Sequence, residues 1–296
     1  MESESSNGYT TNFIRVIVVL FSFIGAFAVG VFVANPHYST HIYRTLCRTP
    51  TISSVLSPSN ARRINTNNST QQSILNLSRI NTTSSVQQSF LNVSLTYKTD
   101  KVTTHHYDIL YEKYLSKYVG SNVILLEIGL GCGMPYGPGA SAYVWRYYLG
   151  PLANIYFLEF DRRCGEEWYK SHGHKVNVTM FYGSQDDITV LNNVKSAQGY
   201  FDVIVDDGGH SMNQQITSFV QLLPKVKSGG IYVIEDLLTS YISTYGGGYL
   251  RNSTTIEFIK KIIENIQTAS PEKSIQVAKR IRSLEIGDEI CFFTVK

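Results

Sequence analysis

Short hydrophobic runs alternate with longer amphipathic segments over the last two thirds of the chain. Short apolar runs bounded by turn residues are typical of buried strands, and longer segments with an apolar face are typical of helices. We predict strands over residues 123–128, 155–160, 176–181, 201–205 and 231–235, and helices over residues 140–148, 162–171, 188–197 and 212–226. The tail predicts two more strands, RSLEIG and EICFFTVK, joined by a turn at Gly287 and Asp288.

This order of elements predicts an α/β fold for residues 97–296. Alternating strands and helices form mostly parallel sheets with right-handed crossovers. We therefore expect a Rossmann-like, doubly wound, mostly parallel seven-stranded sheet with an antiparallel C-terminal strand.

A long uncharged run precedes this domain. Residues 16–34, VIVVLFSFIGAFAVGVFVA, form a 19-residue run without a charge, after a short tail of residues 1–15. About 20 apolar residues cross a bilayer as a helix, whereas the apolar region of a signal peptide usually has about 7–15. We expect an uncleaved transmembrane helix over residues 16–34. A cleaved signal peptide is the alternative.

Residues 35–96 are rich in Ser, Thr and Asn and contain a duplication. INTNNSTQQSILNLS and INTTSSVQQSFLNVS match at ten of fifteen positions, offset by sixteen. This composition cannot bury much surface, so we expect a flexible stalk. The N-x-S/T sequons of the chain start at Asn67, Asn68, Asn76, Asn81, Asn92, Asn177 and Asn252. They indicate either a glycosylated luminal stem or the chance product of an Asn-rich and Ser-rich segment.

The two signals for topology disagree. Arg44, Arg48, Arg62 and Arg63 follow the uncharged run, which favours a cytosolic C-terminal side under the positive-inside rule. The composition of the stalk favours the lumen. We expect a type II single-pass membrane protein of the Golgi or ER with a luminal folded domain.

Charge and cysteine content limit the partners, metal sites and disulfides that we expect. Charged residues make up 17% and the net charge is +3, with no long run of like charges, so no nucleic-acid partner is expected. The four cysteines have no CxxC spacing, which disfavours a zinc site. A chain of this length can fold without disulfides, so we expect free, packed thiols, with disulfides in an oxidising compartment as the alternative.

A glycine loop ends the first strand of the domain. LLEIGLGCG places Gly129, Gly131 and Gly133 behind Glu127. The spacing G-x-G-x-G differs from the G-x-G-x-x-G of dinucleotide folds, which suits a ligand without pyrophosphate, although a plain glycine turn is the alternative. Glu159, at the end of the second strand, is suited to accept both hydroxyls of a ribose, unless it is only a solvated acid.

Two further strand ends carry acids. Gln185 and Asp186, in YGSQDD after the third strand, could meet an adenine edge. VIVDDGGH brings Asp206 and Asp207 to the end of the fourth strand, and YVIEDL brings Asp236 to the end of the fifth. We count Asp206 among the ligand-binding candidates.

Neighbouring parallel strands would bring Asp207 and Asp236 together, and carboxylates in one site repel unless a cation lies between them. Oxygen ligands favour Mg²⁺. His210, three residues after Asp207, could act as a general base there. A capped strand end, with His210 bonded to its own loop, is the alternative.

These motifs resemble the class I S-adenosylmethionine-dependent methyltransferases. The resemblance implies that Glu127, Gly129, Gly131 and Gly133 hold the methionine part of the cofactor, Glu159 the ribose, and Gln185 and Asp186 the adenine. TDKVTTHHYDILYEKYL, LEIGLG, GPGAS, VDDGGH and GGIYVIEDL are similar, in this order, to the macrolide-sugar O-methyltransferases and to related eukaryotic methyltransferase-domain proteins. The resemblance implies that Asp207 and Asp236 bind Mg²⁺ and that His210 is the catalytic base. It also implies that the acceptor is a sugar hydroxyl. The family usually has the motif D-K-G-T-T-H, and in this chain Val102 replaces its glycine.

We therefore expect an S-adenosylmethionine-dependent O-methyltransferase that uses Mg²⁺ to methylate a sugar or similar hydroxyl, with a luminal glycan as the expected acceptor. The alternatives are a methyltransferase for a small molecule or lipid on the cytosolic face, and a catalytically inactive binding module. The glycine spacing disfavours a nicotinamide oxidoreductase.

Overall fold

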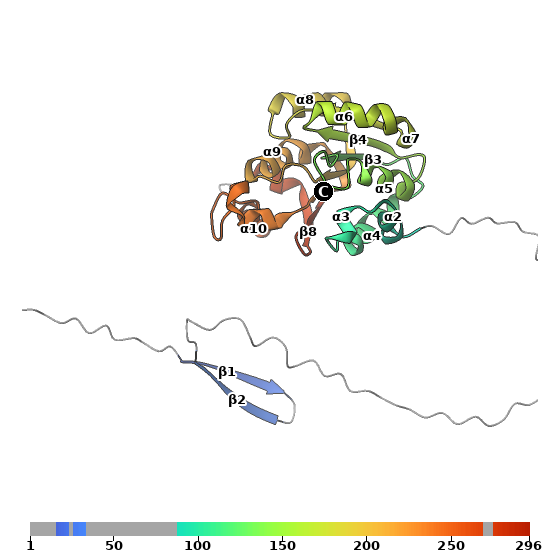
Figure 1. Ribbon diagram of the computed structural model, residues 1–296. Coiled ribbons are helices and arrows are strands. Elements are labelled where there is room, and N and C mark those ends of the chain that lie inside the picture. Colours follow the sequence, from blue (N-terminus) through green and yellow to red (C-terminus); the bar gives the residue numbers. More distant parts are fainter. Residues whose placement is uncertain (1–15, 24–25, 34–87, 269–274) are drawn as a thin grey trace, which may run out of the picture. The chain divides into compact units, whose positions relative to one another are not determined.

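The computed structural model describes residues 16–23, 26–33, 88–268 and 275–296 (Figure 1). The chain divides into two units, Met1–Asn81 and Thr82–Lys296, and each is described by itself.

The first unit contains two strands where a transmembrane helix was expected. Strand β1 (Val16–Phe23) pairs with β2 (Ala26–Val33) in antiparallel register, from Val16 opposite Val33 to Phe23 opposite Ala26. The helical prediction for this run is therefore wrong. Valine, isoleucine and phenylalanine dominate the run, and these residues favour strands over helices. Within the described part of the chain, no helix combines the length and the apolar character needed to cross a membrane. The predicted tail over residues 1–15 and most of the predicted stalk lie outside the described residues.

The second unit begins inside the predicted stalk. Helix α2 (Phe90–Tyr97) starts after Ser89, whose hydroxyl accepts a hydrogen bond from the Asn92 backbone N–H. Phe90 is fully buried, and its ring lies 4.8 Å from Tyr111 and 5.6 Å from Trp145 between centroids. The end of the second sequence repeat is thus part of the core, because Phe90 packs against aromatic rings from helices that come later in the chain.

A seven-stranded sheet forms the centre of this unit, as the sequence predicts. The spatial order is β5-β4-β3-β6-β7-β9-β8, with β3 to β7 parallel and β9 antiparallel to both of its neighbours. The strands are β3 (Ile124–Ile128), β4 (Asn154–Glu159), β5 (Val178–Tyr182), β6 (Phe201–Asp206), β7 (Val226–Ile234), β8 (Ile281–Ile286) and β9 (Cys291–Val295). From β3 the chain moves outward through β4 and β5 and then returns to β6 on the other side. This reversal creates a crevice at the carboxyl ends of β3 and β6, where α/β folds bind their ligands.

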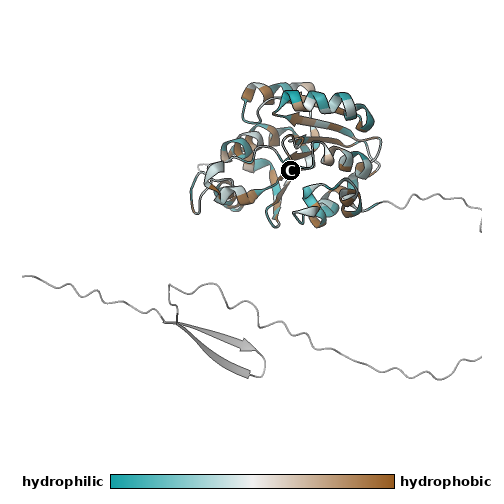
Figure 2. Cartoon of the chain, viewed as in Figure 1, coloured by the Kyte–Doolittle hydropathy of each residue, from teal (hydrophilic) through white to brown (hydrophobic). Residues whose placement is uncertain are grey.

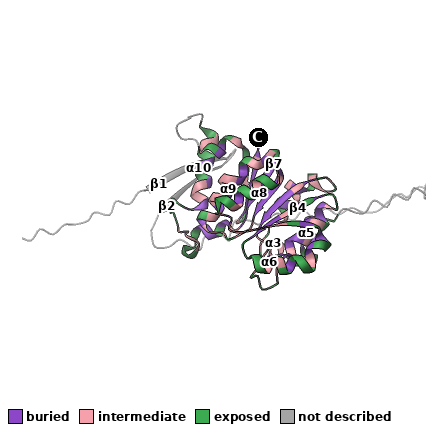
Figure 3. Ribbon diagram, turned by 90° about the horizontal axis from the view of Figure 1, so that it is seen from above, coloured by how far each residue is buried: buried purple, intermediate pink, exposed green. Residues whose placement is uncertain are grey.

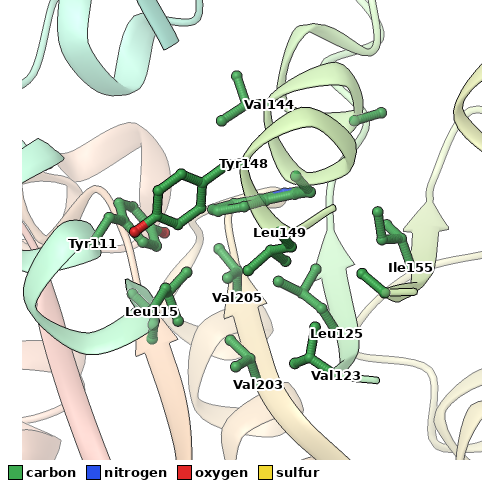
Figure 4. Packing of buried hydrophobic residues seen from close by; sticks show 14 of the residues in the cluster. Tyr111, Leu115, Val123, Leu125, Val144, Tyr148, Leu149, Ile155, Val203 and Val205 are labelled. Atoms are coloured by element: carbon green, nitrogen blue, oxygen red, sulfur yellow. The ribbon is translucent and has the colours of Figure 1, made fainter. Parts of the chain in front are cut away.

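Helices cover both faces of the sheet, and the strands lie between them as a buried layer (Figures 2 and 3). The helices, apart from α2, are α3 (Asp100–Thr103), α4 (Asp108–Leu115), α5 (Ala140–Leu149), α6 (Arg162–Trp168), α7 (His174–Val176), α8 (Ile188–Ala197), α9 (Met212–Leu222) and α10 (Thr255–Gln267). Residues of α2, α4 and α5 share one core cluster with Leu125 and Val203, whereas residues of α8, α9 and α10 share the other with Leu126 and Ile204. Figure 4 shows the first cluster, with Tyr111 and Tyr148 beside the strand residues. Successive strand residues thus point to opposite faces, which explains why their sequences read as continuous apolar runs.

A disulfide joins the loop after β3 to the first turn of α6, so the expectation of free thiols is wrong for Cys132 and Cys164. Each cysteine follows the end of a strand, β3 for Cys132 and β4 for Cys164, and these strands are neighbours. The topology therefore brings together two thiols that lie 32 residues apart. Cys291 is free and buried, and Cys47 lies outside the described residues.

Candidate active site

The crevice holds a cavity of about 760 Å³. Its walls are the loop after β3, the residues after β4, the start of the loop after β5, the turn after β6, Asp236 after β7, and Thr99 and Asp100 from the N-terminal side. The volume is within the range of about 300–1,000 Å³ that is usual for small-molecule sites. Five strand ends predicted to carry chemistry therefore surround one hollow.

The glycine loop allows the main chains of β3 and β6 to approach each other closely. Gly129 has φ +97°, and a Cβ atom added there would lie 2.0 Å from the Asp207 carbonyl oxygen. Gly129 and Gly131 line the cavity, whereas Gly133 is not part of its lining and has open space around it. Position 129 therefore needs glycine for two reasons: its positive φ, and the close approach of the Asp207 carbonyl, which leaves no room for a Cβ atom.

Glu159 holds this loop and faces the cavity. It is only 5% exposed, and its two oxygens accept backbone hydrogen bonds from Leu130 at 2.8 Å and from Asp161 at 2.7 Å. Each carboxylate oxygen has a second lone pair. Glu159 is therefore fixed in orientation and can still accept hydrogen bonds from a pair of ligand hydroxyls.

Glu127 lies behind the cavity wall and is not part of the lining. It is fully buried and accepts hydrogen bonds from Ser141 Oγ and Trp145 Nε1, both at 2.7 Å. Burial raises the pKa of Glu127 to about 7, although the Lys101 ammonium, 3.2 Å away, acts in the opposite direction. In this structure Glu127 binds α5 through Ser141 and Trp145.

Of the two adenine candidates after β5, Gln185 lines the cavity. Its amide donates a hydrogen bond to Asp206 Oδ1 at 2.7 Å, and its carbonyl accepts one from the Gly209 N–H at 2.8 Å. Asp206 is fully buried, and burial raises its pKa to about 6. Asp186 accepts hydrogen bonds from Ser184 and Asn213, and neither Asp186 nor Asp206 lines the cavity. Asp206 therefore supports Gln185 from behind.

Asp207, His210 and Asp236 converge at the cavity, as the sequence predicts. Each offers one ligand atom, and these three atoms lie within 4.8 Å of one another. His210 Nε2 is 3.3 Å from Asp236 Oδ2. His210 and Asp236 have φ of +56° and +54°, a left-handed conformation that is unusual for residues with side chains. Such outliers tend to persist at functional sites, where the surrounding structure enforces them.

Two neighbours of Asp236 were not predicted from the sequence. Tyr107 Oη donates a hydrogen bond to Asp236 Oδ1 at 3.0 Å. His105 lies between two acids, with Nε2 3.5 Å from Asp236 Oδ1 and Nδ1 3.0 Å from Glu289 Oε2. Glu289 comes from the turn between β8 and β9, far away in sequence, and nothing in its local motif indicates this contact.

Lys101 is the largest departure from expectation. Its side chain is 1% exposed, and its ammonium contacts Glu127, Asp207 and Glu235. Burial lowers the pKa of Lys101, but the three carboxylates together raise it well above its usual value. The motif TDKVTTH is the signal that could have identified this residue, but the sequence does not reveal its burial.

The potential ligand atoms of Asp207, Asp236 and His210 suit a hard divalent cation. Asp207 and Asp236 supply carboxylate oxygens at a cavity edge, and the His210 imidazole is within reach of the same position. Oxygen-rich sites with one or two carboxylates are typical for Mg²⁺. These residues therefore fit the ion that the sequence predicts.

The fold and this arrangement of strand ends define a class I methyltransferase fold, although no family model matches the chain. Among curated proteins the chain is 34% identical to the 8-demethyl-8-(2-methoxy-alpha-L-rhamnosyl)-tetracenomycin-C 3'-O-methyltransferase of Streptomyces olivaceus, over 55% of this chain and 40% of that protein. It is 32% identical to the mycinamicin VI 2''-O-methyltransferase of Micromonospora griseorubida, over the same shares of the two chains.

A solved structure of the methyltransferase MycE, from mycinamycin biosynthesis, in complex with Mg, SAH and mycinamycin VI superposes with a TM-score of 0.62. It is 29% identical, over 71% of this chain and 54% of MycE. The resemblance to macrolide-sugar O-methyltransferases is thus confirmed, and the chain spans less than half the length of these two curated relatives.

Proposed function

We propose that this protein is an S-adenosylmethionine-dependent O-methyltransferase that methylates a sugar hydroxyl with the help of Mg²⁺. The convergence of Asp207, His210 and Asp236 at a cavity that also contains Glu159 carries this proposal. Its relatives are named as sugar O-methyltransferases, and MycE was solved with Mg and SAH, which supports the same donor and ion here.

The cavity residues suit the two halves of the donor. Gly129 and Gly131 present backbone to the ligand, while the Glu159 carboxylate accepts the ribose hydroxyls. Gln185 lines the same cavity, and its amide fits the adenine edge. The sulfonium methyl group would then lie toward Asp207 and His210, since these residues line the same cavity after β6.

His210 is the residue suited to take the acceptor proton. When the methyl group passes from sulfur to the hydroxyl oxygen, the C–S bond breaks, a C–O bond forms, and the hydroxyl proton must leave. Asp236 Oδ2, 3.3 Å from His210 Nε2, stabilises the imidazolium that results. Mg²⁺ on Asp207 and Asp236 would supply Lewis-acid activation of the hydroxyl. The donor leaves as a neutral thioether without acid catalysis.

The test is a methyl-transfer assay on the full chain with labelled S-adenosylmethionine. The acceptor panel contains free and glycan-bound sugars together with small-molecule and lipid alcohols, each with Mg²⁺ or with EDTA. We expect transfer to a sugar hydroxyl that EDTA abolishes and Mg²⁺ restores. His210→Ala should lower the rate about 10²–10⁴-fold, because the general base is lost, while calorimetry shows SAH binding within about threefold of wild type.

Four outcomes count against the proposal. A wild-type protein that does not bind SAH is not a methyltransferase of this kind. Binding without turnover on every acceptor favours the inactive binding module, and transfer to lipid or small-molecule alcohols alone favours the other enzymatic alternative. Full activity in EDTA contradicts a role for Mg²⁺ in the reaction.

We also propose a luminal location for the folded domain. The sequons of the stalk support it, as does the Cys132–Cys164 disulfide, because disulfides persist in oxidising compartments. Attachment to a membrane is supported only by the uncharged run of residues 16–34. Glycosidase treatment and carbonate extraction of the expressed protein test the two points separately. A chain without glycans contradicts the luminal location, and full release by carbonate contradicts the attachment.

A further inference from the structure

One buried lysine is bonded to three strand ends of the sheet. Lys101 Nζ lies 2.6 Å from Asp207 Oδ2, 2.8 and 2.9 Å from the two Glu235 oxygens, and 3.2 Å from Glu127 Oε1. An ammonium has three hydrogens to donate. The hydrogen bonds to Asp207 and to the two Glu235 oxygens use all three, and the contact with Glu127 is an ion pair without a hydrogen bond.

The partners of Lys101 come from the three central strands. Glu127 is on β3, Asp207 directly follows β6, and Glu235 directly follows β7. Tyr111, from α4, also donates a hydrogen bond to Glu235. Burying an ammonium is costly unless carboxylates compensate it, so the cluster is stable only when its members stay together.

Only Asp207 of these three carboxylates lines the cavity. Its side chain is 24% exposed, whereas those of Glu127 and Glu235 are 0% and 2% exposed. Lys101 bonds to one Asp207 oxygen, Oδ2, from the buried side. This leaves the other oxygen for a ligand on the cavity side. Groups that orient a metal ligand from behind in this manner affect metal affinity strongly.

The backbone next to Lys101 also borders the site. Thr99 and Asp100 line the cavity, and Lys101 attaches their segment to the sheet. The short helix α3 has only four residues, and its buried Lys101 side chain contacts the strand ends at Asp207 and Glu235.

We infer that Lys101 is a positioning residue, which fixes the Asp207 carboxylate for metal binding and holds α3 as a wall of the donor cavity. This inference rests on the proposed function, because it assigns a role to Asp207 in that site. Lys101 itself does not line the cavity.

The test replaces the Lys101–Glu235 pair by neutral residues in the full chain. Lys101→Met combined with Glu235→Gln removes one ammonium together with one of its carboxylates, so the fold is not left with both charges unbalanced. Glu235→Gln alone keeps Lys101 beside Asp207. Lys113→Met combined with Glu285→Gln is the matched control, since that ion pair, at 2.5 Å, bridges α4 and β8 on the exposed surface.

Two probes are used, Mn²⁺ followed by electron paramagnetic resonance and SAH followed by calorimetry. For the Lys101→Met, Glu235→Gln protein we expect at least a tenfold weaker Mn²⁺ affinity, with an altered spectrum of the bound ion. SAH affinity should also fall, but less. Glu235→Gln alone and the Lys113–Glu285 control should bind Mn²⁺ within threefold of wild type. A purely structural role would lower thermal stability without changing the Mn²⁺ spectrum of the folded protein.

Should the methionine variant not fold, Lys101→Gln with Glu235→Gln keeps a polar side chain in the cluster, but one that is uncharged and one bond shorter. The expectation for Mn²⁺ is the same. Unchanged or tighter Mn²⁺ binding in either folded double variant overturns the inference. If wild-type protein binds neither Mn²⁺ nor SAH, the proposed function itself fails, so the two failures are distinguishable.

Discussion

The contact between Gly129 and Asp207 allows a sharp test of how the site is built. In Gly129→Ala the new Cβ atom would lie 2.0 Å from the Asp207 carbonyl oxygen, and real Cβ contacts are essentially never below 3.0 Å. The two main chains must therefore separate by at least 3.0 − 2.0 = 1.0 Å. The backbone bond from the Asp207 N–H to the Ile128 carbonyl, at 3.0 Å, opposes this shift because it ties the same two segments together.

Gly133→Ala provides the matched control. Gly133 has φ +93°, close to the +97° of Gly129, but nothing lies within 4 Å of its added Cβ. Both variants carry the conformational cost of an alanine at positive φ, on the order of 1–2 kcal/mol. Only Gly129→Ala has the clash in addition, so we expect a total loss of about 3–5 kcal/mol, at the upper end for single substitutions.

Urea denaturation gives the two free energies of unfolding, and Mn²⁺ titration reports the position of Asp207. Because misplacing a reacting group by about 1 Å can cost about 10²-fold in function, Gly129→Ala should lose Mn²⁺ binding strongly even where it is folded. Gly133→Ala should bind Mn²⁺ like wild type. Equal losses of stability in the two variants, or normal Mn²⁺ binding by Gly129→Ala, would refute the reasoning.

Three further outcomes are expected. Burial raises the pKa of Asp206 from 3.8 to about 6, so this group stabilises the fold fully below pH 3.8 and loses that contribution as pH rises through 6. At about 1.4 kcal/mol per pKa unit, the unfolding free energy of wild type should fall by up to about 3 kcal/mol relative to Asp206→Asn over this window; parallel pH curves of the two proteins would contradict it. Reducing the Cys132–Cys164 disulfide, which closes a loop with a sequence separation of 32, should cost about 3–4 kcal/mol of stability in denaturant melts, and dithiothreitol should leave the Cys132→Ser, Cys164→Ser protein unaffected. Glu159→Gln should weaken SAH binding in calorimetry about 10-fold or more, because charged hydrogen-bond acceptors contribute about 1.5–3 kcal/mol, while Glu166→Gln on the exposed side of α6 should not; equal affinities would argue against a ribose contact at Glu159.

The strands of the sheet could be predicted because they are buried on both faces. Runs such as residues 201–205 are apolar at nearly every position, and this one is a parallel strand with its acids at the carboxyl end. The convergence of Asp207 and Asp236 followed from topology alone, since β6 and β7 are neighbours. The sequence of each strand shows where the strand ends, and the carboxyl ends of neighbouring parallel strands lie at the same edge of the sheet. The positions of these acids could therefore be predicted from local sequence.

Contacts between segments far apart in sequence could not be predicted in the same way. A lysine is almost always exposed, so no local pattern indicates that Lys101 is buried among three acids, and Glu289 belongs to a turn that reads as surface. Glu127 and Asp206 are acids at strand ends like Glu159, but neither of them lines the cavity. The expected helix over residues 16–34 was wrong because hydrophobicity and length alone do not separate a membrane helix from paired β-branched strands.

The two tryptophans of the chain lie outside the lining of the cavity and contact residues next to it. The Trp145 indole donates its N–H to Glu127 in the Lys101 cluster, and the Trp168 ring packs on Gly139 at the end of the glycine loop, where an added Cβ would lie 2.3 Å away. We therefore expect the intrinsic fluorescence of the protein to change when a ligand binds in the cavity. Replacing either indole by phenylalanine separates the emission of the lysine cluster from that of the loop, so that both can be followed in real time by stopped flow.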